Sequence, residues 1–175
     1  MDLAAHGLWV GAAALWAVRQ RGLSRRTAGL AVGMALLPDL VQLLPLLVWA
    51  PFGADGWATL QRYVLAAPNQ GPPMAPWLDA ATHHLHCVMH SAVVLGLVSL
   101  LWWAWRGRLW LPLLGWWAHV LIDVFTHSAD FYPSPVLYPL SDWAFDGVAW
   151  NHPAFMGLNY LALAVAWWLA WRPPR

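Results

Sequence analysis

The chain has 175 residues, which fits a single domain over residues 1–175. Apolar residues make up 61% of the chain and charged residues 10%, with 16 tryptophans and neither lysine nor glutamate. So few charges argue against a water-soluble domain of this size, and the dispersed arginines with a net charge of +1 exclude a nucleic-acid-binding protein.

Five apolar segments follow in chain order, each close to the roughly 20 residues that a helix needs to cross the bilayer core. They cover residues 3–18, 27–49, 82–105, 109–126 and 155–171. In the second segment Pro38 and Pro45 predict a kink or a break, because proline removes a backbone donor. Two long loops, 53–81 and 127–153, are expected to cap one end of the bundle. The predicted fold is therefore all-α, a polytopic membrane bundle of about five transmembrane helices.

Arginines gather in the connections that five crossings would place on one side of a membrane. These connections are residues 19–26, 106–108 and 172–175, whereas Arg62 falls on the other side. Because positively charged loops stay in the cytoplasm, we expect the N-terminus outside and the C-terminus inside. The expected location is the cell (inner) membrane, with the lipid bilayer as the main partner.

Histidines and aspartates are predicted to lie at one depth in the bundle. A rise of about 1.5 Å per residue places all of them in the non-cytoplasmic half and none in the cytoplasmic half. His119, Asp123 and His127 are spaced by four residues and therefore share one face of a helix. The residues concerned are His6, Asp39, His86, His90, His119, Asp123 and His127.

Two of these residues are acids that need a positive partner. An ionised carboxylate in hydrocarbon is costly unless a cation neutralises it, and no lysine or arginine falls in the same layer as Asp39 and Asp123. A divalent metal shared with neutral imidazoles would supply the charge. Nitrogen and oxygen ligands without thiolate favour zinc, with manganese or iron as alternatives. A protonated Asp123 hydrogen-bonded to histidine is the simpler alternative. The predicted metal ligands are His6, Asp39, His86, His90, His119 and Asp123.

The sequence resembles the membrane-bound metal-dependent hydrolase family, a bacterial and archaeal group with a domain of unknown function. The matching elements are His6, Pro38-Asp39, His90-Ser91, the run 118–127 and the segment Pro139-Leu140-Ser141-Asp142. Many relatives carry a His-Arg-Gly lead-in before their His-Ser, which this chain lacks. The order of ligands is also similar to that of zinc-dependent phospholipase C.

The resemblance implies hydrolysis of an ester or phosphoester, and the depth of the site favours a lipid substrate at the outer leaflet. His127 and Asp123 are the predicted catalytic residues, with His127 as an outer ligand or a general acid. The alternatives are an intramembrane transporter of metal ions or protons, a haem-binding or other non-catalytic metal protein, and a structural subunit. A transporter would need polar residues in the cytoplasmic half too, and that half offers almost none.

Overall fold

The computed structural model of this chain describes residues 1–66 and 70–173, and every regular element in these ranges is an α-helix. This confirms the expected all-α class. The helices are α1 (Leu3–Arg21), α2 (Arg25–Gln42), α3 (Leu44–Trp49), α4 (Gly56–Val64), α5 (Pro76–Met89), α6 (Ala92–Arg106), α7 (Leu113–Thr126) and α8 (Pro153–Trp171).

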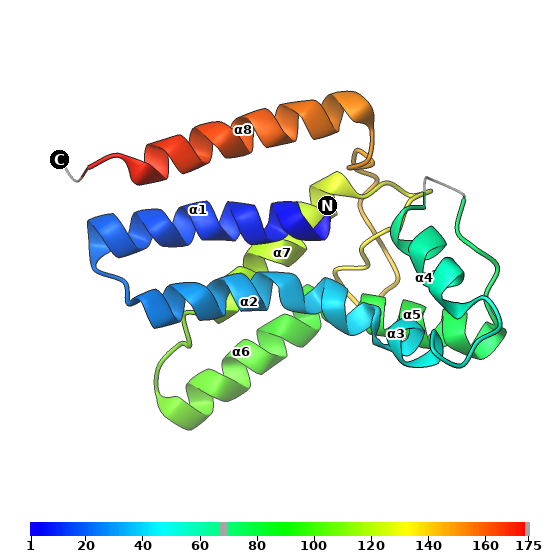
Figure 1. Ribbon diagram of the computed structural model, residues 1–175. Coiled ribbons are helices and arrows are strands. Elements are labelled where there is room, and N and C mark those ends of the chain that lie inside the picture. Colours follow the sequence, from blue (N-terminus) through cyan, green and yellow to red (C-terminus); the bar gives the residue numbers. More distant parts are fainter. Residues whose placement is uncertain (67–69, 174–175) are drawn as a thin grey trace.

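Helices α1 and α2 form an antiparallel pair whose ends the sequence specifies (Figure 1). The Asp2 carboxylate accepts a hydrogen bond from the backbone N–H of Ala5 and so caps the start of α1. Gly22 ends α1 with a φ of 69°, a left-handed conformation that glycine adopts without steric cost. Ser24 then caps α2 through the N–H of Thr27. The short connection brings the two helices side by side.

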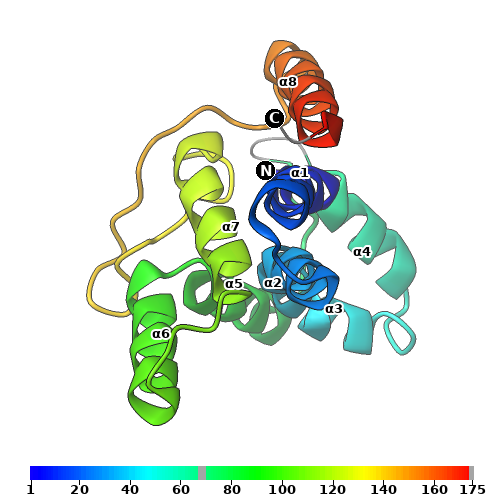
Figure 2. The same cartoon turned by 90° about the vertical axis from the view of Figure 1, so that its left-hand side faces the viewer.

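Helix α7 packs against α2, and α8 packs against α1 (Figure 2). The largest buried apolar cluster joins the middle of α7 to the start of α6, with Trp116, Val120 and Leu95 at its centre. The indole of Trp116 also donates a hydrogen bond of 2.7 Å to the backbone carbonyl of Met89. These contacts fix α7, which carries two of the predicted metal ligands, against the other helices.

Gly115 lets α7 approach the backbone of α2 very closely. A Cβ atom at this position would lie 1.9 Å from the backbone oxygen of Ala31. Gly115→Ala is therefore expected to force the two helices apart and to destabilise the protein by about 1–3 kcal/mol. Thermal unfolding in detergent measures this loss. Gly96→Ala on α6 is the matched control, since no atom lies within 4 Å of the added Cβ, and an unchanged melting temperature for both variants would contradict the prediction.

Among the described helices, α8 alone is both long enough and apolar enough to cross a bilayer unaided. Helices α5 and α6 pass the same test only as a pair, and the pair is bent by 56° at its break. Helix α7 is apolar but short, because 14 residues rise only about 21 Å against a hydrocarbon core of about 30 Å. The structure therefore supports one span, or two if the bent pair is one span.

Two sequence-based expectations about the helices were wrong. The segment 82–105 is not one helix, because it breaks at His90 and Ser91. Ser91 accepts a hydrogen bond from the N–H of Val94 and so starts the new helix α6. The loop 53–81 is not irregular throughout, because it contains α4 and the start of α5.

Other expectations about the helices were confirmed. The second apolar segment breaks at Leu43, ahead of Pro45, whereas Pro38 lies inside α2. The described residues between α7 and α8 contain no helix, as expected of a long loop. Figure 1 also shows the α1–α2 connection, the α6–α7 connection and the end of α8 at one end of the bundle, opposite the N-terminus. The arginine-rich segments thus share one end of the fold.

Candidate metal centre

Four of the predicted ligands come together where α2, α7 and the α5–α6 bend meet. Asp39 lies on α2, His90 at the bend, and His119 and Asp123 one turn apart on α7. One nitrogen or oxygen atom from each lies within 4.8 Å of the others. We call these four residues the metal-ligand group. Residues from three separate parts of the chain therefore supply a set of atoms that could hold one metal ion.

The distances within this group match those between ligands of a single small cation. His90 Nε2 and His119 Nε2 are 3.0 Å apart, and they lie 3.2 Å and 3.0 Å from Asp123 Oδ2. Asp39 Oδ1 is 3.7 Å from His90 Nε2 and 3.8 Å from His119 Nε2. Two ligands of a tetrahedral zinc ion are about 3.3 Å apart when the metal–nitrogen distance is about 2.0–2.1 Å. The three atoms of His90, His119 and Asp123 are therefore spaced as ligands of one metal ion, with Asp39 somewhat farther away.

Main-chain carbonyl groups fix the tautomers of these two histidines. His90 Nδ1 donates to the carbonyl oxygen of His86 at 2.8 Å, and His119 Nδ1 donates to that of Ala35 at 2.7 Å. A carbonyl oxygen can only accept, so in each neutral ring Nδ1 carries the proton and Nε2 keeps a lone pair. Both lone pairs then face each other and the Asp123 carboxylate. These atoms repel one another unless a positive charge, either a metal ion or a proton on one of the rings, lies between them.

Burial increases the need for a cation. The side chains of His90, His119 and Asp123 are almost fully buried, and that of Asp39 is 13% exposed. Within the described ranges no arginine forms an ion pair with either aspartate. Asp123 Oδ2 also has no hydrogen-bond donor. The buried acids therefore fit a divalent cation, as the sequence predicted from the absence of basic side chains.

His6 and His127 lie on the other side of Asp123. The His6 ring is fully buried and stacks on the ring of His119, with 3.7 Å between the ring centroids. Its Nε2 is 3.0 Å from Asp123 Oδ1, while His127 Nε2 is 3.2 Å from the same oxygen. The amino group of Met1 contacts both Asp123 Oδ1 and His127 Nε2. The structure thus brings His6 and His127 to the site without including them in the metal-ligand group.

His86 does not face the metal-ligand group with a free nitrogen. Its Nδ1 lies 2.7 Å from Gln42 Oε1, and its Nε2 lies 3.2 Å from the carbonyl oxygen of Pro133. Both ring nitrogens are thus directed at these two oxygens rather than at the metal-ligand group. His86 instead orients His90 through its carbonyl group.

The sequence did not single out Gln42, although the residue is part of the site. Its amide nitrogen lies 3.4 Å from Asp39 Oδ1, and its amide oxygen contacts His86. Gln42 is a polar residue in an apolar segment, three positions after Asp39, so it lies on the same helix face. This position on the helix face of Asp39 could have identified Gln42 as a site residue from the sequence. Asp142, by contrast, is exposed and lies outside the group.

Tyr132 supplies the carbonyl that orients His127. His127 Nδ1 donates to this oxygen at 2.6 Å, so His127 Nε2 also keeps its lone pair. The backbone of Tyr132 has a φ of 49°, in the left-handed region that costs about 1–2 kcal/mol for residues other than glycine. Strain of this kind persists where surrounding contacts hold the chain in place.

A cavity leads from the metal-ligand group toward the end of the bundle that holds the N-terminus. It has a volume of about 140 Å³. Asp39 and His127 line its inner part, and Tyr63 and Tyr132 also contribute to its wall. The cavity therefore borders the metal-ligand group at Asp39.

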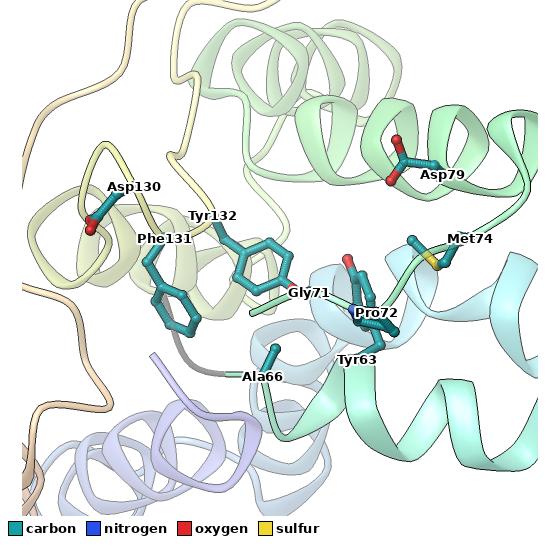
Figure 3. A pocket seen from close by; sticks show the side chains of 9 residues that line it. All are labelled: Tyr63, Ala66, Gly71, Pro72, Met74, Asp79, Asp130, Phe131 and Tyr132. Carbon is teal, nitrogen blue, oxygen red and sulfur yellow. The ribbon is translucent and has the colours of Figure 1, made fainter. Parts of the chain in front are cut away.

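The same two tyrosines line a second pocket of about 240 Å³ (Figure 3). Their rings meet edge to face at 5.5 Å. Burial raises the pKa of both Tyr63 and Tyr132 above the ordinary value, so the phenols stay protonated and act as neutral hydrogen-bond donors. The tyrosine pair thus belongs to the walls of both pockets.

No family model, curated protein or solved structure matches this chain. The resemblance to membrane-bound metal-dependent hydrolases therefore rests on the sequence motifs alone. The structure places two of those motifs together, because the hydroxyl of Ser91 donates to the carbonyl of Tyr138, directly before the Pro139–Asp142 segment.

Proposed function

We propose that this chain is a membrane-embedded, metal-dependent hydrolase that acts on an ester or phosphoester. The observation that supports the proposal is that the Nε2 atoms of His90 and His119 lie with oxygens of two aspartates inside 4.8 Å, while the Nδ1 atoms of both rings donate to backbone carbonyls. Imidazole and carboxylate ligands favour zinc among the common divalent ions. Cys87 does not alter this preference, because its thiol contacts His83 outside the group.

A divalent ion held at this position would supply Lewis acidity and a water molecule of lowered pKa. The residues of the chain have separate tasks. Asp39, His90, His119 and Asp123 would hold the ion, while Gln42 contacts Asp39 and would position it. His127 lies at the cavity wall, where its Nε2 is placed to act as an outer ligand or to hold a proton for the leaving group.

The proposed membrane arrangement has several crossings, with the arginine-rich end in the cytoplasm. The span formed by α8 and the common end of the arginine-rich segments support this orientation. The metal-ligand group and its cavity then face the non-cytoplasmic side of the cell membrane. An ester or phosphoester in a lipid head group lies at this depth, which makes a lipid the favoured substrate.

Two alternatives fit the site less well. A haem with two axial histidines needs space for the macrocycle between the ligand nitrogens, whereas His90 Nε2 and His119 Nε2 are only 3.0 Å apart. A transporter needs polar groups along the whole path, but no histidine or aspartate occurs between Ala92 and Ala118 or between Pro153 and Pro174.

The proposal predicts metal-dependent turnover by the purified protein. Elemental analysis should find at least one zinc ion per chain. The protein should also hydrolyse a phospholipid or a lipid phosphate in mixed micelles, and this activity should depend on zinc. His119→Ala should remove both, because it deletes one of the two imidazoles that face the aspartates. His152→Ala is the matched control, since this histidine is exposed and its side chain does not cap α8.

Each result bears on a different part of the proposal. Metal content that is unchanged in His119→Ala would refute the site. Bound metal without turnover of any lipid ester, lipid phosphate or small soluble phosphoester would refute the hydrolase. Turnover of the soluble phosphoester alone would refute the lipid substrate.

A further inference from the structure

The two carboxylate oxygens of Asp123 face two different pairs of histidines. Oδ2 lies 3.2 Å from His90 Nε2 and 3.0 Å from His119 Nε2. Oδ1 lies 3.0 Å from His6 Nε2 and 3.2 Å from His127 Nε2. A carboxylate can bind one cation through each oxygen, so this arrangement has room for a ligand set on both sides of Asp123.

The His6 ring needs a partner that the protein does not provide. It is fully buried, and neither Nδ1 nor Nε2 forms a hydrogen bond. Although His6 Nε2 lies 3.0 Å from Asp123 Oδ1, the two atoms do not have hydrogen-bond geometry. Unpaired polar groups in such a place are costly and rare. A cation bound to His6 Nε2 and Asp123 Oδ1 would give this histidine nitrogen the partner that it lacks.

His127 presents its lone pair to the same oxygen. Because Nδ1 donates to the Tyr132 carbonyl, the neutral ring has an unprotonated Nε2, which lies 3.2 Å from Asp123 Oδ1. Two atoms that can only accept would repel each other without a positive group. The Met1 amino group lies against both atoms, 2.8 Å from His127 Nε2. A positive charge is therefore accommodated at this position.

We propose that His6, His127 and Asp123 Oδ1 form a second divalent-cation site, with the Asp123 carboxylate bridging the two ions. This inference rests on the proposed function, because the first ion belongs to the metal-ligand group. The distances of 3.0 Å and 3.2 Å around Oδ1 equal those around Oδ2. The second ion would replace the positively charged Met1 amino group between Asp123 Oδ1 and His127 Nε2.

The second site narrows the expected substrate class. Two adjacent ions stabilise the attacking and the leaving oxygen of an in-line displacement at phosphorus. The cavity of about 140 Å³ reaches the site beside His127, so a phosphate group could approach from that side. A phosphoester is therefore favoured over a carboxylic ester.

Metal stoichiometry tests the second site separately from activity. Metal-free protein in detergent is dialysed against buffered zinc, and we expect two ions per chain for the wild type and for His152→Ala. His6→Ala and His127→Gln should each bind one ion. Asp39→Asn should instead weaken binding of the ion in the metal-ligand group. After loading with manganese, the wild type should give a spin-coupled electron paramagnetic resonance signal. His6→Ala should give only the signal of isolated ions.

The outcomes separate the two proposals. One ion per chain in the wild type, unaffected by His6→Ala and His127→Gln, would overturn the second site and leave the first intact. No bound ion in the wild type would overturn both. Melting curves identify a variant that fails to fold, and His127→Gln then decides the question, because His127 lies at the end of α7 rather than in the helix interior.

Discussion

Replacing Asp123 by asparagine is expected to leave the protein without bound metal and to lower hydrolysis on the order of 1000-fold, since metal-ion stabilisation is worth several kcal/mol. Both carboxylate oxygens face imidazole nitrogens within 3.2 Å. An amide keeps one of the two oxygens and directs an NH₂ group toward the other histidine pair. The change is nearly isosteric, so the helix around the residue should persist.

Elemental analysis and turnover by the same preparation measure this effect. Asp142→Asn makes the same chemical change at an exposed loop position and should behave like the wild type. Circular dichroism shows whether the helical content is kept. If Asp123→Asn retained its full complement of metal, the carboxylate could not be a ligand, and the metal-dependent function would have to be abandoned.

Removal of the metal is expected to destabilise the wild-type protein strongly. The ligands come from α2, α7 and the α5–α6 bend, so a bound ion links segments that are distant in sequence. An ion present at about 1000 times its dissociation constant adds about 4.1 kcal/mol to the free energy of unfolding. Chelator should therefore lower the melting temperature in detergent, and added zinc should restore it.

The direction of the pH dependence follows from the ligands. Imidazole and carboxylate bind metal only when deprotonated, so lowering the pH weakens binding. The zinc-dependent part of the stability should accordingly disappear as the pH falls. Asp123→Asn provides the control, because its melting temperature should not respond to zinc or chelator. Equal melting temperatures for the wild type with zinc and with chelator would exclude a structural link through the metal.

The sequence predicted the helices well where a single property determines them. Apolar composition located α8, and proline predicted the break before Pro45. The break at His90 was missed, because the apolar residues continue across it and only the capping role of Ser91 marks it. The five apolar segments did not predict helix length, since α7 and the two halves of the bent pair are each shorter than a standard span.

The site was predictable to the extent that it follows from helix periodicity and charge. The four-residue spacing placed His119 and Asp123 on one face, and the lack of basic residues indicated a cation. The orienting carbonyl groups of Ala35 and His86 could not be predicted, because every residue carries a carbonyl and only tertiary packing selects one. For the same reason, the direction of the His86 ring, toward Gln42 and the Pro133 carbonyl, could not be predicted.

The left-handed backbone at Tyr132 makes the direction of one imidazole depend on a single dihedral angle. The carbonyl that accepts from His127 Nδ1 points correctly only while φ stays near 49°. Glycine and asparagine adopt this conformation readily, whereas branched side chains resist it. Tyr132→Gly would therefore keep the orientation of His127 although it deletes an aromatic ring, and the smaller change to valine would rotate the histidine away from Asp123.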